Sequence, residues 1–124
     1  MEREKILLYS VPAQMHRLIA DICLSMGIEC KKIVSRRYNE AVGLHAGILE
    51  ANRTIPRYED GDLPEPMVVF FGMNNSRKQE FLHLCDEKKL QEGIVMTMIT
   101  KDNMKFTPTY LYAITKKEIM ASEN

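Results

Sequence analysis

The sequence lacks the features that mark several classes of protein. Its 124 residues contain no apolar run near the ~20 residues that span a bilayer, and its first residues lack the apolar stretch of a signal peptide. Basic and acidic residues number 17 each, so no net charge attracts nucleic acid or an anionic membrane. The three cysteines form no CxxC pair and indicate neither a disulfide framework nor a zinc knuckle. We expect one cytoplasmic domain, residues 1–124, with no membrane association.

Motifs for catalysis, nucleotide binding and metal binding are also absent. The chain has no Walker A sequence, no G-x-G-x-x-G and no G-x-S-x-G. His16 and His83 have no His, Cys, Asp or Glu at a tight metal-ligand spacing. Cys23 and Cys85 lie in apolar helical stripes, which favours small core residues over nucleophiles. The sequence therefore predicts no catalytic residue, no metal site and no cofactor, and it leaves the activity open.

The sequence does contain one pattern twice. Apolar runs at residues 5–11 (KILLYSV) and 67–72 (MVVFFG) have bulky apolar side chains in both alternating sets, which predicts strands buried on both faces. A segment with helical apolar spacing follows each run. Second strands are expected at residues 28–35, a more polar edge strand, and at residues 94–100. Strand, helix and strand of these lengths form two βαβ units.

The two units also match one another along the chain. ILLYSV in the first aligns with VVFFGM in the second, and Cys23 falls on Cys85. Gly27 aligns with Gly93 once four residues are inserted. Two origins stay open, an old duplication and two βαβ units that obey the same rules.

We predict an α/β fold, a three-layer sandwich with a mostly parallel four-stranded sheet in the order 2-1-3-4. Right-handed crossovers would place helices on both faces of this sheet. The alternative is a ferredoxin-like α+β sheet, which also has strands 1 and 3 at its centre but leaves one face uncovered. Apolar residues on both faces of the central strands favour the sandwich. A third strand antiparallel to the first would contradict it.

The remaining segments have weaker patterns. Residues 38–50 predict a short helix weakened by two glycines. Residues 58–64 are rich in acids and contain a glycine and a proline, which predicts a mobile surface loop with few buried contacts. The last helix is expected to begin after Thr107 as its N-cap, and the helix of the second unit after Asn75 or Ser76.

Four short motifs are spread along most of the chain. They are VGLHAG at residues 42–47, PMVVFFGM at 66–73, ITxxNxxFT at 99–107, and Leu111 followed by Glu118. Together they resemble a family of small bacterial proteins that is catalogued only as a domain of unknown function. The chain departs from that pattern with Met96-Thr97 in place of a Lys-Ala pair and with Phe106 in place of a tryptophan. The resemblance implies a bacterial, cytoplasmic protein and no particular activity.

One candidate site follows from the predicted sheet. Ligands bind beyond the carboxyl ends of parallel strands, where two polar turns, residues 72–78 and 100–103, are expected to meet. Helix N–H groups, amides and one guanidinium there suit a small anion or phosphate. The candidate ligand-binding residues are Asn74, Asn75, Ser76, Arg77, Thr100 and Asn103. The alternative is that they are capping and turn residues with local roles.

Two classes of function remain. The first is a non-enzymatic binding or regulatory module that acts through partner contacts or self-association, so a homodimer stays open and other partners are unknown. The second is a small-molecule-binding protein for an anion or phosphate, which leaves an enzyme open. Asp102 is the only carboxylate in the two turns, which favours the first class. The most basic patch, Lys31-Lys32 with Arg36-Arg37, suits a solvated edge better than nucleic acid.

Overall fold

A four-stranded sheet forms the centre of the fold. The computed structural model describes residues 3–51, 53–90 and 93–123. Its strands lie in the order β2-β1-β3-β4, which confirms the predicted order. All four are slightly shorter than expected: β1 (Lys5–Tyr9), β2 (Glu29–Ile33), β3 (Met67–Phe71) and β4 (Val95–Met98).

The strand directions differ from the prediction at one junction. β1 and β2 are parallel, as are β3 and β4, so two of the three neighbouring pairs have the expected direction. The central strands β1 and β3 are antiparallel, with Leu7 opposite Val69. The prediction that strand 3 is parallel to strand 1 is therefore wrong. The ferredoxin-like alternative does not describe the sheet either, because β1 pairs directly with β2 and both faces are covered.

The reason lies in the connection between the two βαβ units. An apolar strand has the same burial pattern in either direction, so the sequence of β3 does not reveal which way it points. The end of β2 and the start of β3 lie at the same ends of the strands, level with Tyr9. The connecting residues 34–66 therefore enter β3 where they left β2, and β3 runs antiparallel to both strands of the first unit. Each βαβ unit is as predicted, and only their mutual orientation differs.

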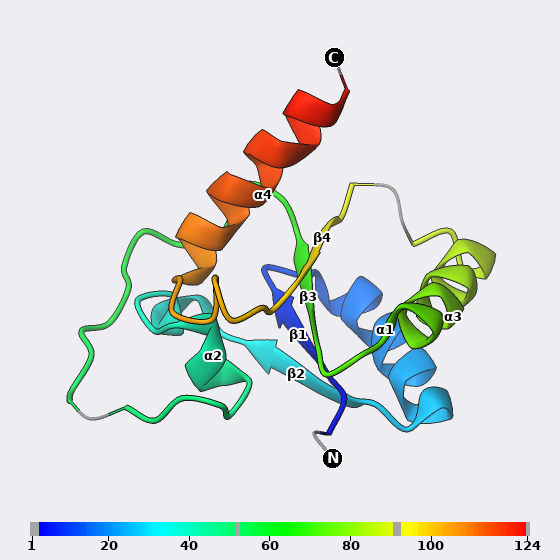
Figure 1. Cartoon of the computed structure of the whole chain (residues 1–124), viewed down its shortest axis with the longest axis horizontal. Helices are drawn as coiled ribbons and strands as arrows, with labels where there is room; N and C mark the ends of the chain where they lie inside the picture. The colour runs from blue at the N-terminus through cyan, green and yellow to red at the C-terminus, as the bar shows by residue number, and fades with distance from the viewer. Residues whose placement is uncertain (1–2, 52, 91–92, 124) are drawn as a thin grey trace.

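Helices cover both faces of the sheet, as predicted. On one face lie α1 (Ala13–Met26) and α3 (Asn75–Glu87), packed on Ile6, Leu8, Val68 and Phe70. The opposite face is covered by α2 (Val42–His45) and α4 (Pro108–Ser122), and the 3₁₀ turn η1 (Ser35–Arg37) leads from β2 to this side. These elements pack on the other alternating set of the central strands, which includes Leu7, Tyr9, Met67, Val69 and Phe71. Figure 1 shows the two groups of helices on opposite sides of the strands.

The turns after β1 and β3 have the same geometry. Ser10 and Gly72 each follow the last strand residue, and both have left-handed backbone angles, with φ of 57° and 73°. Pro12 and Asn74 then occupy the N-cap positions of α1 and α3. The expected N-cap at Asn75 or Ser76 is wrong by one or two residues, because Asn74 Oδ1 accepts the N–H of Arg77.

The ends of α1 and α3 match as well. Gly27 and Lys89 are left-handed, with φ of 71° and 57°. In both helices the next residue donates its N–H to the carbonyl of a buried cysteine: Ile28 to Cys23 at 2.8 Å, and Leu90 to Cys85 at 2.9 Å. The predicted match of Cys23 with Cys85 is therefore confirmed in space, and both are core residues as expected.

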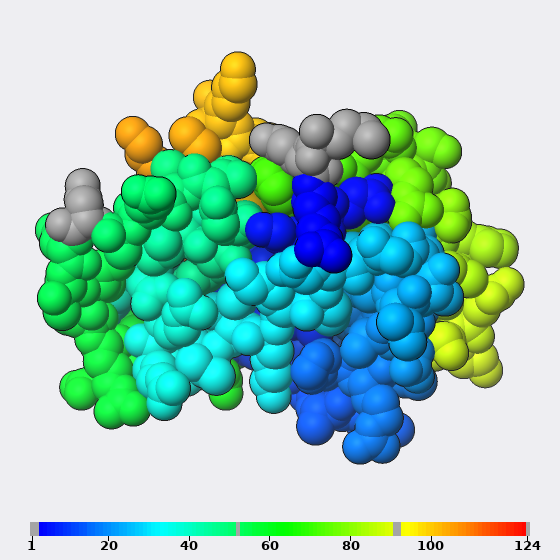
Figure 2. All heavy atoms as spheres, turned by 90° about the horizontal axis from the view of Figure 1, so that it is seen from below, coloured from blue at the N-terminus to red at the C-terminus, as the bar shows by residue number. Residues whose placement is uncertain are grey.

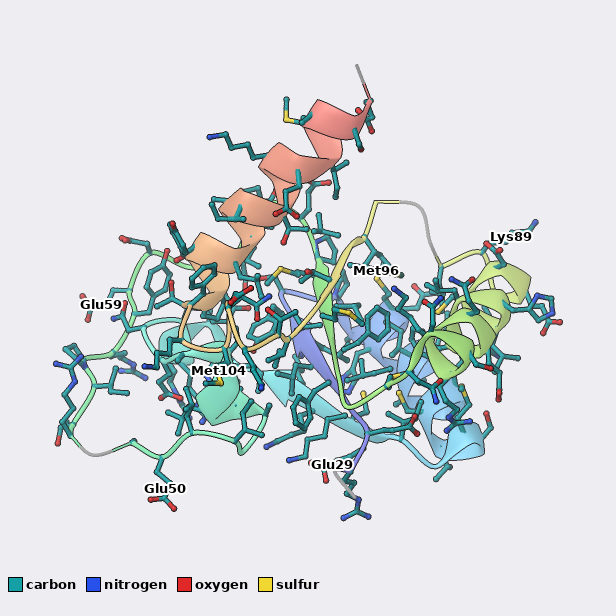
Figure 3. All side chains as sticks on the ribbon, viewed as in Figure 1. Glu29, Glu50, Glu59, Lys89, Met96 and Met104 are labelled. Atoms are coloured by element: carbon teal, nitrogen blue, oxygen red, sulfur yellow. The ribbon has the colours of Figure 1, made fainter. Side chains whose placement is uncertain are left out.

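The segment between the units is more tightly held than predicted. Tyr58 donates its N–H to Arg36 O and its ring lies 5.9 Å from that of Tyr38. Leu63 is buried, and its N–H donates to Ser10 Oγ. The expectation of few buried contacts is wrong at these positions, and residues 59–62 between them are exposed, with Glu59 directed outwards (Figure 3). The mobility of residues 58–64 stays a prediction.

The C-terminal helix extends beyond the body of the molecule. Thr107 Oγ accepts the N–H of Tyr110, which confirms Thr107 as the N-cap. The first half of α4 packs against the sheet through Leu111 and Thr115, whereas residues 117–122 are all exposed. Figure 1 shows this second half projecting from the molecule. Within the described ranges, no helix has the length and apolar content that crossing a membrane requires.

Candidate functional site

The two predicted turns lie at the same edge of the sheet because β3 and β4 are parallel. In the second turn Asn103 Oδ1 accepts the N–H of Thr100 at 2.8 Å, and the Asn103 amide donates to Met98 O at 2.9 Å. In the first turn Asn74 caps α3, while Asn75 and Ser76 are exposed. The amide oxygens of Asn74 and Asn103 are thus bonded within their own turns.

Arg77, the cation of the candidate site, is bonded within the protein. Its guanidinium donates to both carboxylate oxygens of Glu4, at 2.8 and 3.0 Å, and to Met26 O at 2.6 Å. Glu80 lies 3.5 Å away on the same helix. This arrangement follows from the antiparallel central pair, because the start of β1 is brought to the edge where β3 ends. The Glu4 carboxylate therefore occupies the Arg77 guanidinium, which the sequence analysis expected to bind an anionic ligand.

An open cavity of about 460 Å³ lies on the α2 side of the same edge. Four apolar residues contribute to its lining, together with Thr100 and Lys101. The apolar members are Ile48, Phe71, Ile99 and Met104. Thr100 is thus the one predicted site residue that lines this cavity. Mainly apolar walls with one cation suit a small organic anion better than inorganic phosphate.

Two further hollows flank the outer edge of β4. One, of about 270 Å³, lies towards α3 and is lined by Lys78, Leu82 and the β4 residues 96–98. The other, of about 370 Å³, lies between β4 and α4 and is lined in part by Thr97, Ile114 and Glu118. Figure 3 shows Met96 on the side of β4 that faces α3. The edge strand is therefore bordered by a groove on each face of the sheet.

The outer edge of β4 carries main-chain groups that point away from the sheet, and one of them, Met98 O, accepts from the Asn103 amide at 2.9 Å. Val95 and Ile99 donate their N–H groups to Pro66 O and Phe70 O, towards β3. Because N–H directions alternate along a strand, those of Met96 and Met98 point away from β3. In the described part of the chain no strand pairs with β4 on that side. Apart from the Met98 carbonyl, which already accepts from Asn103, the described part of this edge is a template for strand pairing.

A buried hydrogen-bonded chain lies beneath α2, and the sequence did not reveal it. His45 is 1 % exposed, and its Nε2 lies 3.1 Å from Glu40 Oε1. A carboxylate can only accept, so Nε2 carries the proton and Nδ1 accepts from Tyr9 Oη at 2.8 Å. Arg37 donates to the same Glu40 oxygen at 2.9 Å. VGLHAG places His45 in an apolar segment, but its partner Tyr9 is 36 residues away and only the fold shows the pair.

The protonation states in this chain follow from its burial. Burial, with a smaller contribution from the positive charge of Arg37, lowers the pKa of His45 to about 4. Burial also raises the pKa of Tyr9 well above its usual value. A neutral imidazole and a protonated phenol are the forms that the hydrogen bonds require. The chain therefore serves to hold α2 on the sheet.

The other polar groups considered from the sequence have simple surroundings. His83 is exposed and lies 3.4 Å from Glu87, one helical turn away. In the basic patch, Lys31 donates to His45 O and Arg37 pairs with Glu40. Among the described residues, no three His, Cys, Asp or Glu side chains gather closely enough to hold a metal ion. From below, β2 lies at the surface between α1 and the segment that carries α2 (Figure 2).

Comparison with known proteins gives no assignment. No family model matches the chain, no curated protein matches it, and no solved structure matches it. The resemblance to the small bacterial family therefore stays a prediction, carried by the short motifs in the sequence.

Proposed function

We propose that this chain is a cytoplasmic, non-enzymatic binding module that holds a protein partner by strand addition at β4. The observation that carries the proposal is the outer edge of β4, where the N–H groups of Met96 and Met98 point away from β3. An added strand would form main-chain bonds with this edge and place its alternating side chains in the two flanking grooves.

The contrast between the two edges of the sheet supports this choice. β2, the opposite edge strand, contains Glu29, Lys31 and Lys32, and charged side chains are a common protection against unwanted pairing. β4 and the residue on either side of it, Ile94–Ile99, contain no charged residue and no proline. An edge that lacks such protection is suited to pairing.

The groups most suited to acid–base chemistry are already hydrogen-bonded within the protein, which supports a non-enzymatic role. Tyr9 and His45 would be the natural participants in acid–base chemistry, but both are buried and bonded to each other. Arg77, the cation nearest to the N-terminus of α3, is bonded to Glu4. These groups contribute to the fold, whereas the free hydrogen-bonding capacity of β4 lies at the surface.

Hydrogen exchange tests the proposed edge directly. A synthetic peptide of alternating valine and threonine should slow exchange of the Met96 and Met98 amides, because added pairing protects them. The same peptide with N-methyl groups along its pairing edge is the control and should not protect them. On the opposite edge strand β2, the N–H groups of Cys30 and Lys32 point away from β1 in the same way, and their exchange should be unaffected by the peptide. Protection at β2 alone, or equal effects of both peptides, would contradict the proposal.

A second function is favoured by the cavity beside Phe71. The alternative from the sequence was a small anion bound at the strand ends, and this cavity combines apolar walls with Lys101 at that edge. A small carboxylate with an apolar chain matches both. Octanoate should raise the thermal midpoint more than octanol or inorganic phosphate, and at 100 times its Kd it would stabilise by about 2.7 kcal/mol. Lys101→Gln should remove the preference for octanoate, and an unchanged preference would exclude this site.

A further inference from the structure

We propose that the partner of β4 is a second copy of this chain. The two β4 strands would pair antiparallel about a two-fold axis near Thr97 and form one continuous eight-stranded sheet from two four-stranded sheets. This inference rests on the proposed function, since both need the free edge of β4. A second copy is the partner that best fits the uncharged strand β4 and the neighbouring helix α4.

The junction needed for this dimer already exists within the protein. Each βαβ unit is a parallel pair, and the two units are joined by the antiparallel contact of β1 with β3. Pairing β4 with its copy adds another antiparallel contact between parallel pairs. The extended sheet would again consist of parallel pairs joined by antiparallel contacts. The helices α1 and α3 of both copies would lie on one face, and α4 of both copies on the other.

Side-chain charge favours β4 over β2 as the self-pairing edge. In a two-fold interface each residue meets a copy of the same strand, so like charges on one strand face each other. β2 would bring Lys31 and Lys32 into proximity with their copies. In β4, with Thr97 at the axis, Thr97 meets Thr97 and Met96 meets Met98, and neither contact opposes like charges. Methionine side chains also adapt to an interface without a preformed shape.

The outer half of α4 distinguishes a second copy from a single added peptide. Ile119 and Met120 on this half are 36 % and 60 % exposed, on a helix that lies along β4 and then projects away from the body (Figure 1). An axis perpendicular to the sheet would bring both α4 helices to the same face, where each can cover the other's apolar residues. A short peptide would fill the edge of β4 and leave these residues in water.

Charge variants at Thr97 test the dimer. Sedimentation of the parent chain at roughly 100 µM should give a dimer, with a Kd in the micromolar range or tighter. Thr97→Lys and Thr97→Glu should each be monomeric, because each places like charges at the axis. An equimolar mixture of the two should dimerise again, because unlike charges then face each other. Thr54→Lys, at an exposed position away from β4, adds the same charge and should leave the dimer intact.

The mixture separates a broken interface from a broken fold, since misfolded variants would not restore a dimer together. Met120→Lys, on the exposed half of α4, should weaken the dimer roughly tenfold or more without affecting the fold. A monomeric parent chain, dimers of either single Thr97 variant, or a mixture that stays monomeric would overturn the inference. The peptide-exchange experiment is done at a concentration where the chain is monomeric, because pairing in a dimer would itself protect the Met96 amide. A chain that the peptide protects but that forms no dimer keeps the proposed function and loses only the second copy.

Discussion

Glu4 and Arg77 form a two-pronged ion pair across the junction of the two βαβ units. The guanidinium donates to both carboxylate oxygens and also to Met26 O, so it links the residue before β1 and the end of α1 to the first turn of α3. Both side chains are about a quarter exposed, at 22 % and 30 %. The pair exists because β1 and β3 are antiparallel, which places the start of the chain beside the first turn of α3.

Charge reversal at this pair should reveal its contribution. An acid in the first turn of α3 would suit the helix dipole, and on that ground alone Arg77→Glu would cost little stability. The structure places such an acid against Glu4, so Arg77→Glu should lower the thermal midpoint more than Arg77→Gln does. The double variant Glu4→Arg with Arg77→Glu should recover part of the loss. Equal midpoints for the two single variants would show that the pair is unimportant.

Replacing Lys89 with glycine should stabilise the protein. Lys89 ends α3 with a left-handed φ of 57°, in the place that Gly27 occupies after α1. A residue with a Cβ pays about 1 kcal/mol for this conformation, so Lys89→Gly should raise the free energy of unfolding by up to roughly that amount. The neighbouring Lys88 has a φ of −96°, and Lys88→Gly is the matched control that should bring no gain. Denaturant titration measures both.

The free energy of unfolding should decrease as the pH is lowered from 6.5 to 4, because unfolding then exposes His45 to protonation. Its pKa is lowered to about 4 in the fold, so between pH 6.5 and 4 the unfolded chain takes up a proton that the folded chain does not. The contribution is complete above pH 6.5 and decreases by up to about 1.4 kcal/mol per pH unit as the pH falls towards 4. His45→Gln should flatten this part of the curve. His83→Gln, at an exposed histidine, should leave it unchanged.

Gly43 should not tolerate alanine although it lies in a helix. A Cβ there would come within 2.6 Å of Met104 O and 2.8 Å of the Leu49 side chain. The Gly43 N–H donates to the same Met104 carbonyl, so the close approach is part of how α2 docks. Gly43→Ala should therefore destabilise by about 1–3 kcal/mol, as overpacking does. Helix propensity alone predicts a gain, and a stabilised variant would contradict the close packing.

The same segment shows what local patterns could not supply. A short helix weakened by two glycines was predicted within residues 38–50, and the structure has a single helical turn there, α2. This turn is held by contacts distant in sequence: Val42 donates to Phe106 O, and His45 bonds to Tyr9. Periodicity reports the burial of one element and not its distant partners, so VGLHAG was recognisable as a motif while its role was not.

The sequence by itself determined the elements and their burial. Runs with apolar side chains in both alternating sets specified β1 and β3 as central strands. Apolar residues at helical spacing specified α1, with Cys23 in the core. The strand order and the Thr107 cap were also predictable, because they follow from hydrophobic burial and from local hydrogen bonding.

Only the tertiary structure decided how the two units face each other. A strand buried on both faces has no sequence signature of its direction, and residues 34–66 are long enough to return the chain either way. The antiparallel contact of β1 with β3 then placed Glu4 beside Arg77. The candidate site depended on that orientation, since a side chain is free for a ligand only when the fold brings it no partner of its own.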